Sequence, residues 1–130
     1  MPWDEDYTDL INNLKKKSMA EQLDFDILCH DTWLNDPDKK NADPSMRNFL
    51  ISNVYTKRQA QNMMLHPEAF TPDDVKRTVE ALKYNQLGHK MFAEATESGK
   101  EDWRKTAPVS WHRGWESLYQ GWIDALEKKK

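Results

Sequence analysis

Apolar residues recur at spacings of three and four in each patterned stretch of this chain, and this spacing limits what it can fold into. Tyr7, Leu10, Ile11 and Leu14 give the first stripe, at positions i, i+3, i+4 and i+7 of an amphipathic helix. No stretch alternates apolar and polar residues in the manner of a half-buried strand. We therefore expect an all-α fold, a compact irregular bundle of four to six helices.

Capping signals divide the N-terminal third of the chain. The first helix is expected over about residues 4–17, and Ser18 and Glu21 then have the spacing of a capping box. In such a box the Ser18 hydroxyl accepts a hydrogen bond from the Glu21 amide, and the Glu21 side chain reaches back to the Ser18 amide. The helix that starts here should run to about Leu34, either as a separate helix or as a continuation of the first.

Prolines mark the next boundaries. Residues 35–44 contain two prolines and no periodicity, which indicates a loop. Asp43 and Pro44 suit the N-cap and first position of a helix that should reach about Leu65. His66 precedes a proline, which disfavours the α conformation and should end that helix.

A long helix is expected from Thr71 and Pro72 to Ser98 and Gly99. Threonine is a good N-cap, proline suits the first turn, and glycine is the usual residue just past a helix end. We expect one apolar stripe to face the core along this whole segment. Its members are Val75, Val79, Leu82 and Gln86, extended past Gly88 by Leu87, Met91, Phe92 and Ala95.

The last helix should begin near residue 109 and carries an aromatic face. Of the six tryptophans in the chain, four lie within twenty residues: Trp103, Trp111, Trp115 and Trp122. Tyr119 and Ile123 lie off the main stripe, so this helix is apolar on more than one side and needs more than one neighbour.

Length and composition favour one domain. The chain has 130 residues and a mass of 15.4 kDa, and we expect a single helical domain over residues 1–130.

No apolar run approaches the roughly 18–20 residues that span a bilayer, so we expect no membrane partner. The acidic start of the chain lacks the apolar region of a secretory signal, and Cys29 is the single cysteine. These features favour the reducing cytoplasm.

The charge is small but unevenly distributed. The net charge is -3, which argues against general attraction to nucleic acid. Residues 1–50 hold 6 basic and 11 acidic side chains, whereas residues 51–130 hold 13 and 11. This asymmetry fits either two contact surfaces or the ordinary variation of a charged protein surface.

The histidines do not form a recognisable catalytic or metal-binding pattern. His30 and Cys29 are sequence neighbours, which on a helix point about 100° apart, and His112 lies one turn before Glu116. The chain has no HxxxH, HExxH or CxxC motif and no glycine-rich phosphate loop. We expect no enzymatic activity, no metal and no cofactor, and a structural or surface role for each histidine.

The acidic loop after residue 35 imitates a calcium-binding loop without its chemistry. Lys40 occupies a ligand position, Asn41 replaces the glycine of the turn, and Arg47 stands where the bidentate glutamate belongs. We interpret this segment as a solvated loop that caps the following helix.

The tryptophan-rich segment allows three interpretations. Its rings could form the buried stripe of a small bundle, because each aromatic ring buries roughly 150–250 Å². Alternatively, part of the face is exposed and binds another protein, since Trp, Tyr and Arg are the residues most enriched at interface hot spots. The candidate protein-binding residues are Trp103, Trp111, Arg113, Trp115, Tyr119 and Trp122.

The third interpretation is single-stranded nucleic acid, with tryptophans stacking on bases and basic side chains contacting phosphates. Its candidate residues are Trp103, Arg104, Lys105, Trp111 and Arg113. Acidic residues in the same stretch reduce the local positive charge. Of the two binding interpretations, nucleic acid therefore ranks second, after a protein partner. We expect a small intracellular non-enzymatic protein-binding module, such as an adaptor, inhibitor, assembly factor or regulatory subunit, whose partner is another protein or a second copy of the chain.

Overall fold

Five α-helices and one short 3-10 turn make up most of what the computed structural model describes, which is residues 8–36, 44–99 and 109–128. The elements are α1 (Thr8–Lys15), α2 (Met19–Leu34), α3 (Pro44–Leu65), η3 (Pro67–Ala69), α4 (Pro72–Glu97) and α5 (Val109–Glu127). No strand occurs in these ranges, and the all-α prediction is confirmed. Of the helices described, none combines the length and the apolar character needed to cross a membrane.

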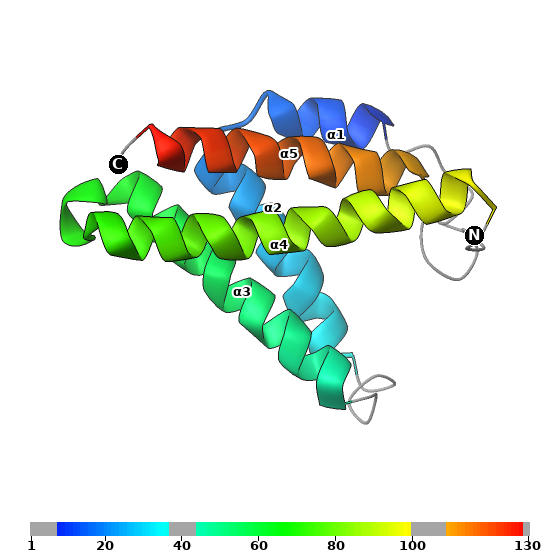
Figure 1. The fold of residues 1–130 in the computed structure, drawn as a ribbon, viewed down its shortest axis with the longest axis horizontal. Helices are drawn as coiled ribbons and strands as arrows, with labels where there is room; N and C mark the ends of the chain where they lie inside the picture. The colour runs from blue at the N-terminus through cyan, green and yellow to red at the C-terminus, as the bar shows by residue number, and fades with distance from the viewer. Residues whose placement is uncertain (1–7, 37–43, 100–108, 129–130) are drawn as a thin grey trace.

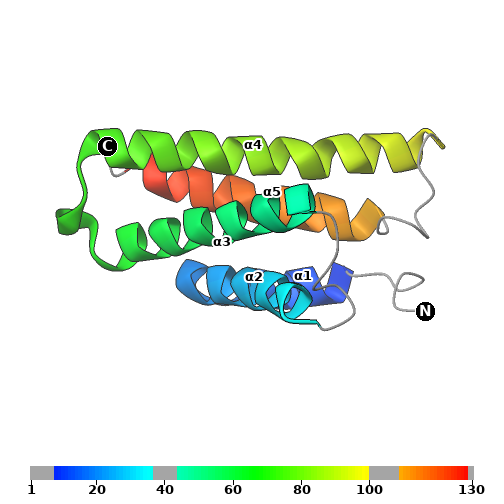
Figure 2. The same cartoon turned by 90° about the horizontal axis from the view of Figure 1, so that it is seen from below.

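The helices lie in three layers (Figure 2). α4 forms the outer layer on one side, α3 and α5 lie in the middle, and α1 and α2 form the other side. α4 runs along α5, and α2 runs along α3, as the extensive contacts within each pair also show. The α2–α3 pair crosses the α4–α5 pair at an angle (Figure 1).

The ends of α4 follow from local capping, as predicted. The Asp74 amide donates to Thr71 Oγ1 at 3.1 Å, and the Asp74 carboxylate accepts from the Thr71 amide at 3.0 Å, which completes a capping box. Ser98 is the C-cap, and Gly99 follows with a φ of 78°, a left-handed conformation that glycine adopts without a steric cost.

α1 and α2 are separate helices, joined by a short turn. Ser18 is the N-cap of α2, and its Oγ accepts from the Glu21 amide at 3.2 Å. The Glu21 carboxylate accepts from the Ser18 hydroxyl at 3.0 Å instead of from the Ser18 amide. The predicted hydrogen bond from the Glu21 amide to the Ser18 hydroxyl is therefore present. The Glu21 side chain contacts the Ser18 hydroxyl, whereas in a full capping box it would contact the Ser18 amide.

α5 is the central helix of the core. It contacts α4, α1, α3 and α2, as its two apolar sides predict. Trp122 Nε1 donates to Gln22 Oε1 at 2.9 Å, and a Cβ on Gly114 would lie 2.8 Å from Ile11 Cδ1, so α1 can approach only a glycine there. The buried cluster consists of Ile11, Leu14, Leu23, Ala60, Met63, Val75, Val79, Leu82, Trp115, Leu118, Tyr119, Trp122, Ile123 and Leu126.

The second half of α4 departs from the sequence prediction. Leu87, Met91 and Phe92 are 48%, 60% and 47% exposed, so the expected apolar stripe past Gly88 does not face the core. On a straight helix, positions 85, 89 and 93 lie on the same buried face as Leu82. This chain has Asn, His and Ala at these positions. Polar side chains therefore occupy the inward positions, and large apolar ones point away from them.

Candidate functional site

Three of the predicted binding residues lie inside the core. Trp115, Tyr119 and Trp122 are at most 1% exposed. The ring centroids of Tyr119 and Trp122 are 4.8 Å apart, edge to face, and those of Trp115 and Trp122 are 6.3 Å apart. In this fold these rings hold α5 to its neighbours, the first of the three interpretations above, and a partner cannot reach them without opening the bundle.

Of the two remaining tryptophans of the candidate set, the structure describes Trp111. Trp111 is half-buried and meets Trp115 edge to face, with centroids 5.5 Å apart. The other tryptophan of the candidate set, Trp103, lies outside the described residues, as do Arg104 and Lys105.

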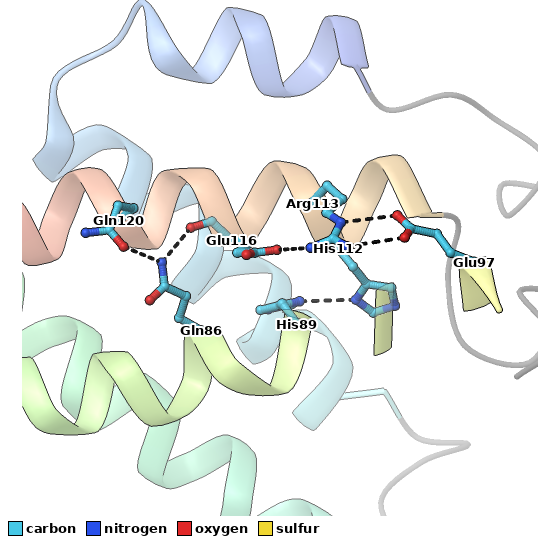
Figure 3. Close-up of polar contacts among 7 residues, drawn as sticks. All are labelled: Gln86, His89, Glu97, His112, Arg113, Glu116 and Gln120. Atoms are coloured by element: carbon cyan, nitrogen blue, oxygen red, sulfur yellow. Dashed lines mark hydrogen bonds and ion pairs between the residues drawn. The ribbon is translucent and has the colours of Figure 1, made fainter. Parts of the chain in front are cut away.

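Arg113 is held by two carboxylates on the surface between α4 and α5 (Figure 3). Its Nε lies 3.2 Å from Glu97 Oε1, and its Nη1 lies 2.9 Å from Glu116 Oε2. Hydrogen bonds to these carboxylates raise the pKa of Arg113 above its ordinary value. The charge of Arg113 is thus offset within the chain, which leaves this side chain poorly suited to a phosphate.

Inward-facing polar side chains of α4 find partners on α5 (Figure 3). Gln86 Nε2 donates to the Glu116 carbonyl and to Gln120 Oε1, both at 3.0 Å. One turn further along α4, His89 Nδ1 lies 3.2 Å from His112 Nδ1, so one imidazole donates to the other. These contacts explain how α4 can turn a polar face toward the core.

The two facing histidines are neutral at pH 7. Burial lowers the pKa of His89 to about 3 and that of His112 to about 4. His112 is 7% exposed, and the ring of Phe92 stacks on it with centroids 5.5 Å apart. His112 Nε2 has no hydrogen-bond partner among the described residues. The pair therefore joins α4 to α5 without adding charge to the core.

A buried ion pair lies between α2 and α3. Lys57 is fully buried, and its Nζ is 2.6 Å from Asp26 Oδ2. The same Nζ lies 3.2 Å from His30 Nε2 and 5.2 Å from the centroid of the Tyr119 ring on α5. Since a lysine ammonium only donates, His30 Nε2 accepts, which places the imidazole proton on Nδ1, 3.6 Å from Asp26 Oδ1.

Burial is the main influence on the pKa values of the groups around this ion pair. Burial, with Lys57 adding to it, lowers the pKa of His30, and burial, with Asp26 adding to it, raises the pKa of the Cys29 thiol. A neutral thiol is a weak nucleophile. The ammonium of Lys57 is closed off from solvent and directed at Asp26, so the arrangement links three helices.

Sequence reasoning did not find Lys57, although α3 carries a signal. Asn53, Lys57, Ala60 and Met64 share one face of α3 at helical spacing, so the polar members of this set fall on a core-facing stripe. A lysine at such a position needs a buried carboxylate, and Asp26 is the buried acidic residue among the described ranges.

Among the described residues, exposed large apolar side chains occur on α2, α3 and α4 but not on α5, and on α4 they follow one another at helical spacing. Tyr84, Leu87 and Met91 are 68%, 48% and 60% exposed and occupy positions i, i+3 and i+7. We call these three residues the α4 stripe. α4 is an outermost layer of the bundle (Figure 2). A Cβ on Gly88, in the middle of the stripe, would have no neighbour within 4 Å.

A groove of about 430 Å³ opens between α3, η3 and the start of α4. Its polar side chains are used within the chain: Gln59 Nε2 donates to the Tyr55 hydroxyl at 2.9 Å, Asp74 caps α4, and Arg77 pairs with Asp73. These polar side chains therefore already have partners within the chain.

In the ranges that the structure describes, no three His, Cys, Asp or Glu side chains gather as a metal site would require. The candidate surface is the α4 stripe. Comparison with known protein families, with curated proteins and with solved structures found no match for this chain.

Proposed function

We propose that this protein is a non-enzymatic protein-binding module and that the α4 stripe is its docking surface. One observation carries the proposal: α4 buries Asn85 and Thr78 while it leaves Tyr84, Leu87 and Met91 exposed. Stability alone would favour the opposite arrangement, because burial of a large apolar side chain contributes about 1.5–3 kcal/mol.

The spacing of the stripe supports a protein partner. Single exposed apolar residues are common on protein surfaces, but three at i, i+3 and i+7 form a continuous ridge on one helix. Tyrosine and methionine are also enriched at the centres of protein interfaces. The stripe can therefore place its three side chains in an apolar groove or against another helix.

The other features of the chain fit an adaptor, inhibitor, assembly factor or regulatory subunit. The titratable groups Asp26, His30 and Lys57 lie inside and contact one another, which favours a structural role for them. The lone Cys29 is half-buried and favours a reducing compartment such as the cytoplasm. The nucleic-acid alternative has less support, because Glu97 and Glu116 offset the charge of Arg113.

Capture from native lysate tests the proposal. The tagged wild-type chain, the variant Leu87→Gln/Met91→Gln and the control Ile51→Gln are compared with and without nuclease. Glutamine keeps the helix propensity of leucine and methionine, and Ile51 is a 51% exposed apolar residue on another helix, α3. We expect a nuclease-resistant protein that the wild type and the control retain and the stripe variant loses.

Two results would contradict the proposal. Equal capture by the stripe variant and the wild type would place binding elsewhere on the molecule. Capture that disappears with nuclease would favour the nucleic-acid alternative.

A further inference from the structure

Large buried apolar side chains hold only the first half of α4 against the bundle. Val75, Val79 and Leu82 belong to the core cluster, whereas the buried residues of α4 beyond Leu82 are Asn85 and Ala93. An alanine methyl buries far less apolar surface than a valine or leucine side chain. The second half of α4 is therefore attached more weakly, and its polar contacts with α5 decide whether it stays in place.

One of these polar contacts joins two imidazoles (Figure 3). His89 Nδ1 lies 3.2 Å from His112 Nδ1, so one nitrogen donates a hydrogen and the other accepts it. When both rings are protonated, each Nδ1 carries a hydrogen and the contact has no acceptor. We propose that the His89–His112 contact is a pH-sensitive latch: protonation of both rings releases α4 beyond Gly88 from α5, while its first half stays packed. This inference goes beyond the proposed function and does not rest on it, because it concerns the inner face of α4.

A single added proton also fits the closed latch poorly. An imidazolium carries a hydrogen on both nitrogens, and His112 Nε2 is buried without a hydrogen-bond partner among the described residues. A charged N–H in that position is costly. The ring of Phe92, stacked on His112, adds to the enclosure. Burial accordingly lowers the pKa of both rings, to about 3 for His89 and to about 4 for His112.

The carboxylates near the latch already face cations. Asp26 favours the charged form of His89, but its Oδ2 lies 2.6 Å from Lys57 Nζ. Lys57 and His30 both oppose the charged form of His89. The titratable and charged side chains around the latch are Asp26 and His30 of α2, Lys57 of α3, Glu97 of α4, and Arg113, Glu116 and Tyr119 of α5.

Toward the surface, Glu97 and Glu116 are both paired with Arg113. The Glu97–Arg113 ion pair joins the end of α4 to α5, but it is exposed, and exposed ion pairs contribute little. An imidazolium in the latch would have to share its counter-charge with Lys57 or Arg113. The surroundings therefore do not compensate for protonation of the latch.

Gly88 lies directly before the latch and weakens the helix there. Glycine lowers helix stability relative to alanine, and a Cβ at this position would touch nothing within 4 Å. Packing within the chain therefore does not require the glycine. Breaking α4 at this position costs less than it would with alanine there.

The latch opens as the pH falls. Above about pH 6.5 both histidines are neutral in the closed and in the released state, and the latch is closed. Below about pH 6.5 the released rings bind protons that the closed rings do not bind, because burial lowers the pKa of the closed rings. Two such histidines raise the opening equilibrium constant by up to about 100-fold per pH unit, and one raises it by up to about tenfold.

Thiol labelling measures this opening. In a Cys29→Ser background, Ala93→Cys reports on the second half of α4 and Val79→Cys on the first half, since both positions are at most 1% exposed. A dithiodipyridine reagent labels each protein at several pH values from about 7 to about 5. Each rate is divided by the rate of the same cysteine in the urea-unfolded chain, so that the pH dependence of the thiol itself cancels.

From about pH 6 to about pH 5 we expect the labelling of Ala93→Cys to rise roughly 10- to 100-fold, and Val79→Cys to stay at least about tenfold slower. Equal labelling of the two positions would mean that the whole chain unfolds together and would overturn the inference. Labelling of Ala93→Cys that does not change with pH would overturn it too.

Amide hydrogen exchange gives a second measurement on the unsubstituted chain. A released helical end of about ten residues is not stable in water, so its amides exchange when the latch opens. After correction for intrinsic exchange rates, the amides of residues 89–93 should lose protection at a higher pH than those of residues 75–82. Simultaneous loss in both ranges would contradict the latch.

Glutamine variants test which groups carry the pH dependence. Glutamine offers a donor and an acceptor but does not titrate. In the Ala93→Cys protein, His89→Gln and His112→Gln should each leave about a tenfold dependence per pH unit, and the double variant should remove it. His66→Gln is the matched control, because the His66 side chain is 67% exposed, and it should keep the full dependence. A double variant that keeps the full dependence would assign it to another group, such as His30, and overturn the inference.

Discussion

Lys57 illustrates how strongly one residue can depend on a partner far away in the sequence. Its Nζ is fully buried and lies 2.6 Å from Asp26 Oδ2. Lys57→Met would leave the Asp26 carboxylate buried without its counter-charge, and we expect a loss of about 3–5 kcal/mol in the free energy of unfolding. Urea unfolding measures this loss.

The matched control is the double variant Lys57→Met/Asp26→Asn, which removes both charges. We expect it to regain a large part of the lost stability, because a neutral amide is much less costly to bury than an unpaired carboxylate. A double variant that is less stable than Lys57→Met would contradict this account of the ion pair.

The neutral histidines predict a pH dependence of stability. Burial holds the pKa of His112 at about 4 and that of His89 at about 3, below the ordinary value of about 6.5. Above pH 6.5 the histidines are neutral in both folded and unfolded chains, and their contribution to stability is fully present. As the pH falls below 6.5 the unfolded chain binds protons that the folded chain does not, so stability decreases until the folded histidines titrate.

Each such histidine contributes a slope of up to about 1.4 kcal/mol per pH unit. Urea unfolding between pH 6.5 and 5 should therefore show a steep decrease, since His30 also has a lowered pKa. His112→Gln should reduce the slope by about one proton. An unchanged slope in this variant would mean that His112 is already charged in the folded protein.

At the scale of helices, α1 and α5 meet at a glycine. A Cβ on Gly114 would lie 2.8 Å from Ile11 Cδ1, and Ile11 is 3% exposed. We expect Gly114→Ala to cost about 1–3 kcal/mol through this overlap. Gly121 is a matched control on the same helix, because a Cβ there has no neighbour within 4 Å.

Gly121→Ala should leave stability unchanged or raise it by up to about 1 kcal/mol, since alanine favours the helix. Thermal unfolding of both variants measures the difference. Ile11→Ala should make Gly114→Ala less costly than it is in the wild-type background. The account of this helix contact is wrong if Gly114→Ala and Gly121→Ala have the same effect.

The limits of α4 could be predicted from the sequence, but its orientation could not. Thr71 and Gly99 act on the residues beside them, so local capping chemistry defines where the helix begins and ends. Which side of α4 faces inward depends on its contacts with α5, where the His112 ring lies within hydrogen-bond distance of the His89 ring. Apolar spacing alone therefore assigned Leu87 and Met91 to the core, and they are exposed.

For the whole molecule, the sequence predicts the fold class better than it predicts which apolar side chains are exposed. The tryptophan-rich segment could form a core or a hot spot, and the same residue types suit both uses. Trp115 and Trp122 became core because α5 lies in the middle layer, with neighbours on several sides. That position is a property of the assembled bundle, which no short motif encodes.

The central claim at this scale is that the bundle is complete without the α4 stripe, so that its side chains are available to a partner. The most direct test is the free energy of unfolding of Leu87→Gln/Met91→Gln beside that of Leu82→Ala, a fully buried position on the same helix. Dilute protein keeps self-association from adding to the measured stability.

We expect the stripe variant to unfold within about 0.5 kcal/mol of the wild type, as a surface substitution does. Leu82→Ala should lose about 2–5 kcal/mol. If the stripe variant lost as much stability as Leu82→Ala, the stripe would belong to the fold of the single chain, and the claim that it is a free binding surface would be contradicted.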